Sequence, residues 1–447
     1  MEFNEFKQKL FIKAKEAGFT DCEIYFVNRE SLGITVYEQE VDKYNLNKTF
    51  GLSFRGLYDN KMGYSYTEIL DEAAINMLVN NAIEGAKSIE STDKQFIYKG
   101  DKEYENVKTY SKELENLDVE KLIQITKDME KDAKEYSDKV VNVAGCSLSY
   151  GQSNYGIFNT LGLELTNKSN ILSAYVCPVI EDNNQKYDGT GYVIAESLTE
   201  VDPMKIAKMG VDEALSRIGG RSIESAKYSA IIYNEAMVSL IGAFIDIFDA
   251  DAAQKGLSLL KDKEGEEIAS TIVTIVDNPL LERGLSSTPF DDEGVRTYKK
   301  DIVKDGKLIT LLHNLKTANK AGVKSTGNGF KPSYASPVSV SSTNFYIENG
   351  EKSLDDLMKE VSEGILLTEF AGLHSGANYI TGDFSLAAKG FYIKDGKKAF
   401  PVEQITASGN FFDLLKDIED IGNDLKFPLS SIGSPSIRIG EISIAGK

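Results

Sequence analysis

Histidine is scarce in this sequence, which places only His313 and His374 among its 447 residues. Metal-dependent hydrolysis usually relies on imidazoles spaced so that two of them lie on one face of a helix. His313 and His374 are too far apart in the chain to form such a local pair. A zinc site in this chain alone would need both histidines and several carboxylates to be brought together by folding. The scarcity of histidine therefore argues against a metal site.

Cysteine is rare as well. The three cysteines, Cys22, Cys146 and Cys177, are scattered along the chain and show no CxxC spacing. An odd and dispersed set of thiols does not provide a disulfide framework, and a zinc site made from these thiols alone is disfavoured. We expect reduced, buried cysteines, as in a cytoplasmic protein.

Positive charge is in deficit, since 50 Lys and Arg residues face 69 Asp and Glu residues, for a formal charge of −19. Nucleic-acid binding needs a basic surface that releases counterions, so DNA and RNA are disfavoured as partners. No apolar run is long enough to span a membrane, and residues 1–19 have the spacing of an amphipathic helix rather than of a signal peptide. We expect a cytoplasmic protein with no membrane partner.

The common motifs for nucleophilic catalysis and nucleotide binding are also missing. The sequence has no GxSxG elbow, no GxGxxG after a strand and no GxxxxGK[ST] loop. Ser375 follows His374 directly, but adjacent residues rarely present a serine to the neighbouring imidazole. The segment STGNG (325–329) has the composition of an anion-binding loop, and a plain loop is the better interpretation.

The sequence that is present predicts an α+β protein in two parts. In the N-terminal part we expect helices over 1–19, 67–88, 112–136 and 202–220, and β-strands within 22–67 and 140–193. Asp202 is the expected N-cap of the last of these helices, Pro203 lies in its first turn, and Gly219 and Gly220 end it. We place a domain boundary there, giving a domain over 1–220, with subregions 1–90 and 110–220, and a strand-rich, largely antiparallel domain over 221–447.

The C-terminal part begins with a short buried strand, AIIY, and an almost wholly apolar helix, NEAMVSLIGAFIDIF (234–248). Three segments beyond it have the pattern of two-residue hairpins: VKDGKL (303–308), YIENGEK (346–352) and IKDGKK (393–398). Asp-Gly and Asn-Gly favour the positive φ angles that such turns require. Helices and strands are segregated along the chain rather than strictly alternating, which favours the α+β class.

The segment GLHSGANYITGDFSLAAKG (372–390) is the strongest candidate for a functional loop. Its glycines allow positive φ angles and close backbone contacts, and Asn378 and Asp383 can define turns by bonding to nearby backbone groups. A tightly packed turn, in which neighbouring carbonyl groups bind His374, is favoured over direct contact with a ligand. The candidate substrate-groove or structural-loop residues are His374, Ser375, Gly376, Asn378, Gly382, Asp383 and Ser385.

Several long segments resemble the TldD/PmbA family, and more narrowly its PmbA branch, also called TldE. They are FDDEGVRTYKKDIVKDGKLITLLHNLKTANKAGVKSTGNG (290–329), the stretch 372–415 and the ending SPSIRIGEISIAG (434–446), with further similarity at 159–176 and 214–225. The resemblance implies a cytoplasmic two-part α+β protein linked to proteolysis. In this family TldD and TldE pair to form a zinc metallopeptidase that cleaves extended or unfolded peptides, and TldD supplies an HExxxH helix and a distant cysteine as metal ligands.

This sequence departs from the TldD pattern at the metal ligands. The helix that would carry HExxxH, 234–248, contains no histidine, and the segment SIGSPS (431–436), where the cysteine would fall, has none. No zinc ligand or catalytic residue carries over. Glu235 is then a first-turn residue favoured by the helix dipole. The apolar residues that follow it indicate core or subunit interface: Met237, Val238, Leu240, Ile241, Phe244, Ile245, Ile247 and Phe248.

These observations favour a non-catalytic subunit that pairs with a zinc-bearing TldD-type paralogue and holds an extended peptide against a sheet edge. A homodimer of the chain alone is an alternative assembly. A second hypothesis is a stand-alone hydrolase that uses His313, His374 and carboxylates such as Asp291, Asp292 or Asp383. A third, also attached to the family, is a protein-binding modulator of DNA gyrase that has no catalytic activity.

Overall fold

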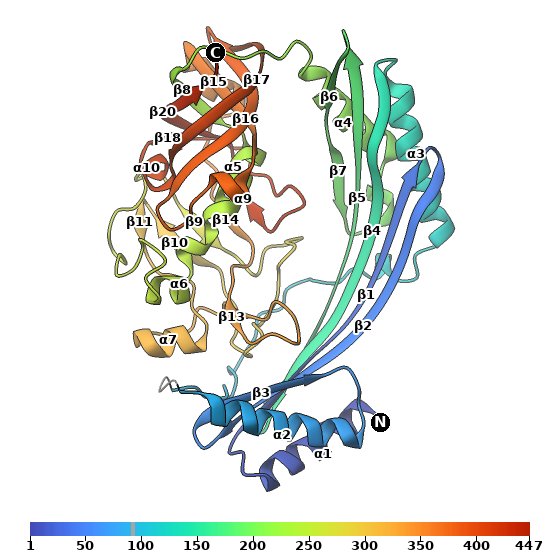
Figure 1. Ribbon diagram of the computed structural model, residues 1–447, viewed down its shortest axis with the longest axis vertical. Helices are drawn as coiled ribbons and strands as arrows, with labels where there is room; N and C mark the ends of the chain where they lie inside the picture. The colour runs from blue at the N-terminus through green and yellow to red at the C-terminus, as the bar shows by residue number, and fades with distance from the viewer. Residues whose placement is uncertain (91–93) are drawn as a thin grey trace.

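The computed structural model describes residues 1–90 and 94–447, and two parts of the chain lie side by side in it (Figure 1). One is a long, twisted antiparallel sheet with helices, and the other is a strand-rich part formed by the C-terminal half. The predicted α+β class is confirmed. The position of the domain boundary near residue 220 stays a prediction.

The N-terminal sheet has seven strands in the order β3-β2-β1-β4-β5-β6, with β7 also pairing with β5. The strands are β1 (Cys22–Tyr37), β2 (Glu40–Tyr58), β3 (Lys61–Thr67), β4 (Val140–Asn159), β5 (Glu164–Asp182), β6 (Gln185–Asp188) and β7 (Gly191–Ala195). Both central residues of three of its turns have positive φ, namely Glu38 and Gln39, Asp59 and Asn60, and Asn183 and Asn184. Such turns match the twist of the strands that they join.

Four helices cover this sheet at two separate places. Helices α1 (Phe3–Glu16) and α2 (Glu72–Ser88) pack near the lower end in Figure 1, and α3 (Val119–Tyr136) and α4 (Pro203–Ser216) pack near the upper end. The side chain of Asp202 accepts a hydrogen bond from the backbone N–H of Lys205, as predicted. Two predicted helices begin later than expected, because Asp71 and Asp118 act as N-caps.

The C-terminal part contains a six-stranded sheet in the order β17-β16-β15-β8-β20-β18. Its strands are β8 (Ala226–Ile232), β15 (Glu363–Ala371), β16 (Asp383–Lys394), β17 (Lys397–Asn410), β18 (Ile418–Ile421) and β20 (Ile437–Ala445). A second sheet has the order β11-β10-β9-β14-β19, made of β9 (Ile275–Asp277), β10 (Lys300–Lys304), β11 (Lys307–Leu308), β14 (Phe345–Ile347) and β19 (Ile432–Gly433). The pair β12 (Gly329–Phe330) and β13 (Ser339–Val340) stands apart from both.

Short helices connect these strands, and α5 contacts both sheets through β15 and β19. They are α5 (Asn234–Phe244), α6 (Ala250–Gln254), α7 (Leu315–Ala321), α8 (Leu354–Lys359), α9 (Leu373–Gly376) and α10 (Phe411–Lys416). The predicted apolar helix is α5 followed by a 3₁₀ turn, Ile245–Phe248. Met237, Leu240 and Phe244 are fully buried in the core of the C-terminal part. These side chains therefore serve the chain's own core rather than a subunit interface.

Two of the three predicted hairpins are confirmed. Asp305 and Gly306 join β10 to β11, and Asp395 and Gly396 join β16 to β17, all with positive φ. The prediction for 346–352 is wrong, because β14 pairs with β9 and β19 instead of a returning strand. After β14 the backbone N–H of Gly350 donates to the carbonyl of Gly422, so a distant segment takes the place of the second arm.

Among the described residues, no helix is both long and apolar enough to cross a membrane.

Candidate functional site

Helix α5 follows directly after β8, a central strand of the six-stranded sheet. A network of hydrogen bonds holds Asn234, the first residue of α5. Buried Asn234 donates its side-chain amide to the carbonyl of Asp424 at 3.0 Å and to the carboxylate of Asp424 at 3.2 Å. Ser436 donates its hydroxyl to the same carboxylate at 2.7 Å and its backbone N–H at 2.8 Å. The start of α5 and the segment 424–436, which is far from it in the sequence, therefore meet on one carboxylate.

The next residue, Glu235, connects the two parts of the chain. Its carboxylate is paired with the ammonium group of Lys426 and accepts a hydrogen bond at 3.0 Å from the hydroxyl of Tyr192, which lies on β7 of the N-terminal sheet. Burial and the carboxylate of Glu235 raise the pKa of Tyr192, so this phenol stays protonated and donates. Glu235 is thus already engaged by one cation and one hydroxyl.

A cavity of about 280 Å³ lies beside Glu235, between α4 and the six-stranded sheet. Arg217 crosses it and binds Glu213 at 2.7 Å and Glu369 at 2.9 Å, and Lys389 lies 3.3 Å from the same Glu369. Burial raises the pKa of Glu403, which also lines the cavity. Paired charges of both signs suit the recognition of a polar chain such as a peptide backbone, and the cavity volume approaches the lower end of that usual for small-molecule sites.

The predicted loop 372–385 lies at the surface. Gly372 precedes α9 as its N-cap with a φ of 82°, and His374 and Ser375 are exposed on that short helix. The side chain of Asn378 accepts hydrogen bonds from the backbone of Ile380 and Thr381, which confirms the predicted local turn. Asp383 instead binds the side-chain amide of Asn410 at 2.9 Å.

The remaining predicted loop residues are part of the same surface. Gly376 packs close to the backbone of Ser385, and the hydroxyl of Ser385 accepts a hydrogen bond from Ser408 at 3.0 Å. Gly382 has a φ of 84° and faces the ring of Phe412. The role of these residues in binding a substrate stays a prediction.

The two histidines are not brought together. His313 lies two residues before α7 and His374 lies on α9, and Figure 1 shows these helices well apart in the C-terminal part. His313 is buried, with Nδ1 3.2 Å from the hydroxyl of Thr317, and burial lowers its pKa to about 4. It is therefore neutral at pH 7 and packed into the fold.

Two of the three acids proposed to accompany these histidines, Asp291 and Asp292, are buried between the two parts of the chain, whereas Asp383 is exposed. Asp291 accepts hydrogen bonds from the backbone of Glu293, Val295 and Gly329, and burial raises its pKa well above its usual range. Burial also raises the pKa of Asp292 to about 6. Both acids are buried, because the turn that they define is covered by the N-terminal sheet.

A buried ion-pair cluster lies next to these acids. Arg55 of β2 donates to Glu23 of β1 at 2.7 Å and to Glu293 at 3.1 Å. Lys331 donates to the hydroxyl of Ser53 at 2.8 Å, and burial, followed by the charge of Arg55, lowers its pKa to about 8. The cluster fastens the C-terminal loops to the N-terminal sheet.

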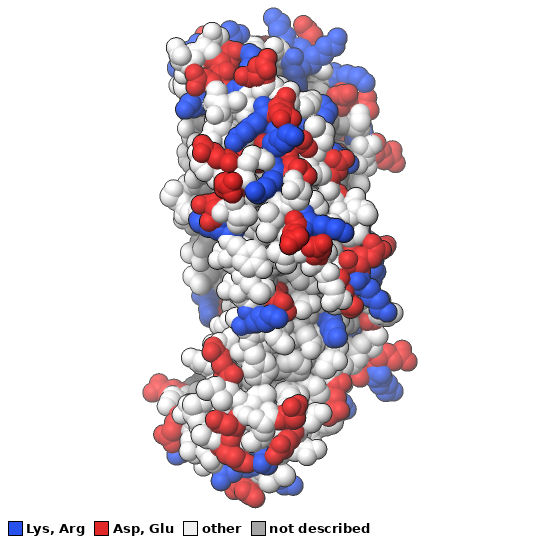
Figure 2. All heavy atoms as spheres, turned by 90° about the vertical axis from the view of Figure 1, so that its right-hand side faces the viewer, with Lys and Arg blue, Asp and Glu red and all other residues white. Residues whose placement is uncertain are grey.

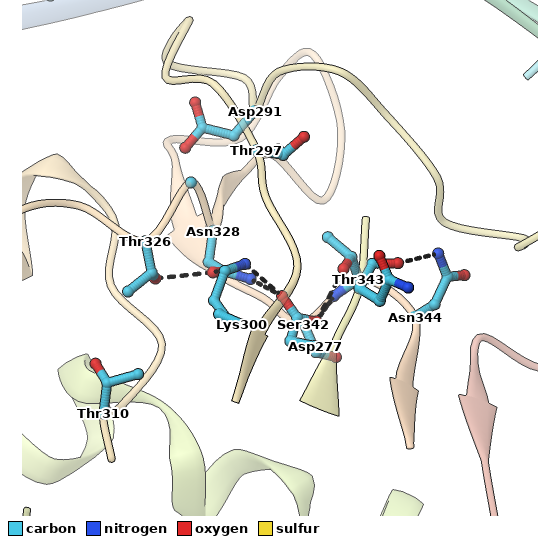
Figure 3. A network of polar contacts seen from close by, with 12 residues as sticks. Asp277, Asp291, Thr297, Lys300, Thr310, Thr326, Asn328, Ser342, Thr343 and Asn344 are labelled. Atoms are coloured by element: carbon cyan, nitrogen blue, oxygen red, sulfur yellow. Dashed lines mark hydrogen bonds and ion pairs between the residues drawn. The ribbon is translucent and has the colours of Figure 1, made fainter. Parts of the chain in front are cut away.

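A second buried network lies deeper in the C-terminal part (Figure 3). The carboxylate of Asp277, at the end of β9, binds the ammonium group of Lys300 at 2.8 Å, the amide of Asn328 at 2.9 Å and the hydroxyl of Thr343 at 2.9 Å. Thr326 donates to Asn328 at 2.8 Å. The carboxylate is satisfied by protein groups on every side, so this network holds loops together.

Comparison with known proteins decides the family. Sequence models of the PmbA/TldA metallopeptidase match residues 22–86 (domain 1), 112–218 (central domain) and 225–446 (C-terminal domain). Metalloprotease PmbA of Escherichia coli O157:H7 is 31% identical over 73% of this chain and 70% of its own length. This chain belongs to the PmbA/TldD metallopeptidase family.

Solved structures agree with this assignment. A Thermotoga maritima protein named for a proposed role as a modulator of DNA gyrase has a TM-score of 0.92 and 34% identity, covering 99% of this chain and 100% of its own. TldE of Thermococcus kodakarensis has a TM-score of 0.90 with 20% identity, covering 99% of this chain and 100% of its own, so that comparison shows the fold.

The residues at the start of α5 do not fit a zinc ion. If Glu235 takes the place of the glutamate in HExxxH, Asn234 and Ser239 occupy the two histidine positions. Zinc prefers thiolate, imidazole and carboxylate ligands, whereas the ammonium group of Lys426 already neutralises Glu235. In residues 1–90 and 94–447, no cluster of three or more His, Cys, Asp or Glu side chains is placed to hold a metal ion.

Sequence reasoning identified Glu235 but missed its partners. Lys426 is 191 residues away and Tyr192 is 43 residues away, and neither lies in a recognisable motif. Asp424 and Ser436 were missed for the same reason, since only the fold brings them to Asn234.

Proposed function

We propose that this chain is the zinc-free member of a TldD/TldE-type peptidase, which binds extended peptides that a TldD-type subunit cleaves. One observation carries the proposal: the helix that the resemblance places at HExxxH has no histidine, and its Glu235 is paired with Lys426. If Glu235 takes the place of the glutamate in HExxxH, Asn234 and Ser239 stand at the two histidine positions, and neither side chain is a usual zinc ligand.

The surroundings support a role in peptide binding. The cavity beside Glu235 is lined by charged side chains of both signs, and β16 and β17 lie next to it. An extended peptide can bind such a surface through its main-chain groups. In the partner, zinc would activate a water molecule and polarise the scissile carbonyl. We place the assembly in the cytoplasm, as the family resemblance implies.

The test compares the chain alone with the chain and a partner. The purified protein is analysed for bound zinc by plasma mass spectrometry and for cleavage of an unfolded peptide, and a TldD-type protein carrying HExxxH is then added. We expect neither zinc nor turnover from the chain alone, and faster cleavage by the mixture than by the partner alone. Stoichiometric zinc and turnover by the isolated chain would overturn the proposal.

The role of the loop 372–385 can be tested in the same assembly. His374→Ala and Ser375→Ala remove exposed side chains, so neither should lower the melting temperature. If the loop holds peptide, both variants raise KM of the assembly and leave kcat unchanged. A change in melting temperature without a change in KM would assign the loop to the fold.

A second candidate function is modulation of DNA gyrase, which the name of the Thermotoga maritima relative suggests. A net charge of −19 argues against direct contact with DNA but is compatible with contact with a protein. Co-sedimentation of the purified chain with gyrase tests this function, and a filter-binding assay at low salt tests the DNA alternative.

A further inference from the structure

The cavity beside Glu235 contains two charged groups that the chain leaves unmatched. Most of the charged side chains that line it take part in ion pairs, namely Glu213, Arg217, Glu235, Lys389 and Lys426. The other two are Lys398 and Glu403. Within residues 1–90 and 94–447, no carboxylate lies within 4 Å of the ammonium group of Lys398, and no cation lies within 4 Å of the carboxylate of Glu403. A ligand that carries both signs of charge would complete both groups.

Both charged groups come from β17. Residues five positions apart point to opposite faces of a regular strand. The pairing of β17 with β16 shifts twice between Lys398 and Glu403, once at Ala399 and once at Glu403 and Gln404, and Gln404 has a φ of 56°. Such bulges redirect side chains, which allows Lys398 and Glu403 to line the same cavity.

Gly220 leaves room for the side chain of Glu403. A Cβ atom at Gly220 would lie 2.7 Å from Cγ and Cδ of Glu403. The backbone N–H of Glu403 donates to the carbonyl of Arg221 at 3.2 Å, which holds β17 against this turn. The double glycine predicted to end the helix at 202–220 therefore also allows β17 to place a carboxylate in the cavity.

The cations around Glu403 are bound elsewhere. Desolvation raises the pKa of Glu403, against the charges of Lys389 and Arg217, which lower it. Arg217 lies 2.9 Å from Glu369 and Lys389 lies 3.3 Å from the same carboxylate. Neither cation is therefore free to neutralise Glu403.

Lys398 is likewise without a counter-charge. Its ammonium group lies 4.6 Å from the centre of the Phe391 ring, a contact that favours a cation without neutralising it. Desolvation lowers the pKa of Lys398, against the charge of Asp355, which raises it. An opposite charge brought by a ligand would stabilise the charged form of Lys398, and equally that of Glu403.

The overall charge of the chain favours a ligand with no net charge. A protein with a charge of −19 repels anions. Figure 2 shows acidic and basic side chains interspersed over the upper part of one face, without a broad basic patch that would attract an anion. A zwitterion avoids this repulsion, and its two ends interact with the cavity only at close range.

The spacing of the two groups suits a short peptide. On an extended strand, residues five positions apart lie about 16 Å from one another, and the long side chains of Lys398 and Glu403 can shorten that span. An extended peptide covers about 3.3–3.6 Å per residue, so roughly two to four residues connect the two groups. The cavity volume of about 280 Å³ agrees with a ligand of this size.

We propose that the cavity beside Glu235 binds a short peptide with two free ends, its α-ammonium group against Glu403 and its α-carboxylate against Lys398. The inference rests on the proposed function, because it takes a peptide as the ligand of this site. It adds that the chain recognises the ends of a peptide rather than an internal segment. Peptide hydrolysis supplies such ligands, since each cleavage creates one new amine end and one new carboxylate end.

Calorimetric titration of the isolated chain tests both contacts. The probes are trialanine, N-acetyl-trialanine and trialanine amide, and blocking either end should weaken binding to the wild type roughly tenfold. In Glu403→Gln the free and acetylated peptides should bind equally. In Lys398→Met the free and amidated peptides should bind equally. These cycles assign each end of the peptide to one side chain.

Matched controls and the contrary outcomes are as follows. Lys397→Met and Glu351→Gln change exposed residues outside the cavity and should keep the wild-type affinities. Equal binding of free and blocked peptides by the wild type would overturn the inference and leave the proposed function standing, because the peptide would then bind through its main chain. A blocking penalty that persists in both cavity variants would also overturn it. So would a lack of binding by all three probes, in which case the cleavage assay with the TldD-type partner decides the proposed function separately.

Discussion

The ammonium group of Lys426 contacts the carboxylate of Glu235 at the first turn of α5. The contact joins a segment near the C-terminus to the helix that, in the resemblance to TldD, would carry the metal ligands. A cation supplied by the chain therefore already neutralises the glutamate in the first turn of this helix.

Rebuilding the metal ligands tests this relationship. Asn234→His with Ser239→His restores the HExxxH pattern, but we expect weak zinc binding because Lys426 repels a divalent cation. Adding Lys426→Met should increase zinc affinity, as measured by calorimetric titration. If the double histidine variant holds stoichiometric zinc with Lys426 in place, the ion pair is not what excludes the metal.

Arg55 should be essential for the stability of the contact between the two parts. Arg55→Leu removes the guanidinium group that binds the buried carboxylates of Glu23 and Glu293, and we expect a loss of roughly 3–5 kcal/mol in the free energy of unfolding. Urea unfolding measures this loss. Lys87→Leu is the matched control, because its pair with Glu84 is exposed and should contribute less than about 1 kcal/mol. Equal losses in both variants would contradict the buried-pair argument.

His313 should make stability fall in acid. Burial lowers the pKa of His313 to about 4, so between the ordinary value of about 6.5 and that pH the unfolded chain binds the proton and the folded chain does not. This difference favours unfolding as the pH falls, by up to roughly 3 kcal/mol. In His313→Gln that part of the pH dependence should disappear from urea unfolding measured at several pH values. His374→Gln is the control, since its ring is exposed, and it should keep the wild-type slope.

Two glycines of the loop 372–385 allow backbone strain and steric clash to be separated. Gly372 and Gly382 have φ angles of 82° and 84°, but a Cβ atom at Gly372 would meet nothing within 4 Å, whereas at Gly382 it would lie 2.5 Å from the ring of Phe412. Gly372→Ala should cost about 1 kcal/mol through strain alone. Gly382→Ala should cost more, and thermal unfolding compares the two. A smaller loss at Gly382 would mean that Phe412 moves aside freely.

Local signals explain which parts of the fold could be predicted. The cap at Asp202 and the turns at Asp305 and Asp395 are set by residues close in sequence, and all three appear as expected. The related Asn-Gly signal failed at Asn349, because the backbone N–H of Gly350 donates to the carbonyl of Gly422. A dipeptide specifies a turn but does not specify which strand lies next to it.

The candidate site was predictable only in part for the same reason. Glu235 could be found because the helix around it has a strong apolar pattern and a counterpart in the family. Its partners Tyr192 and Lys426 come from other sheets and loops. Single polar residues in strands and loops carry no local pattern that shows them converging on one carboxylate.

The length of β1 has a consequence for how the N-terminal part comes apart. Ile24 near its start packs with α1 and α2, and Ile34 near its end packs in the separate core with α3 and α4. Strand β1 thus contributes side chains to two separate hydrophobic cores. If either core unfolds, β1 loses part of its packing and so weakens the other core. We therefore expect the N-terminal sheet and its four helices to unfold as one cooperative unit.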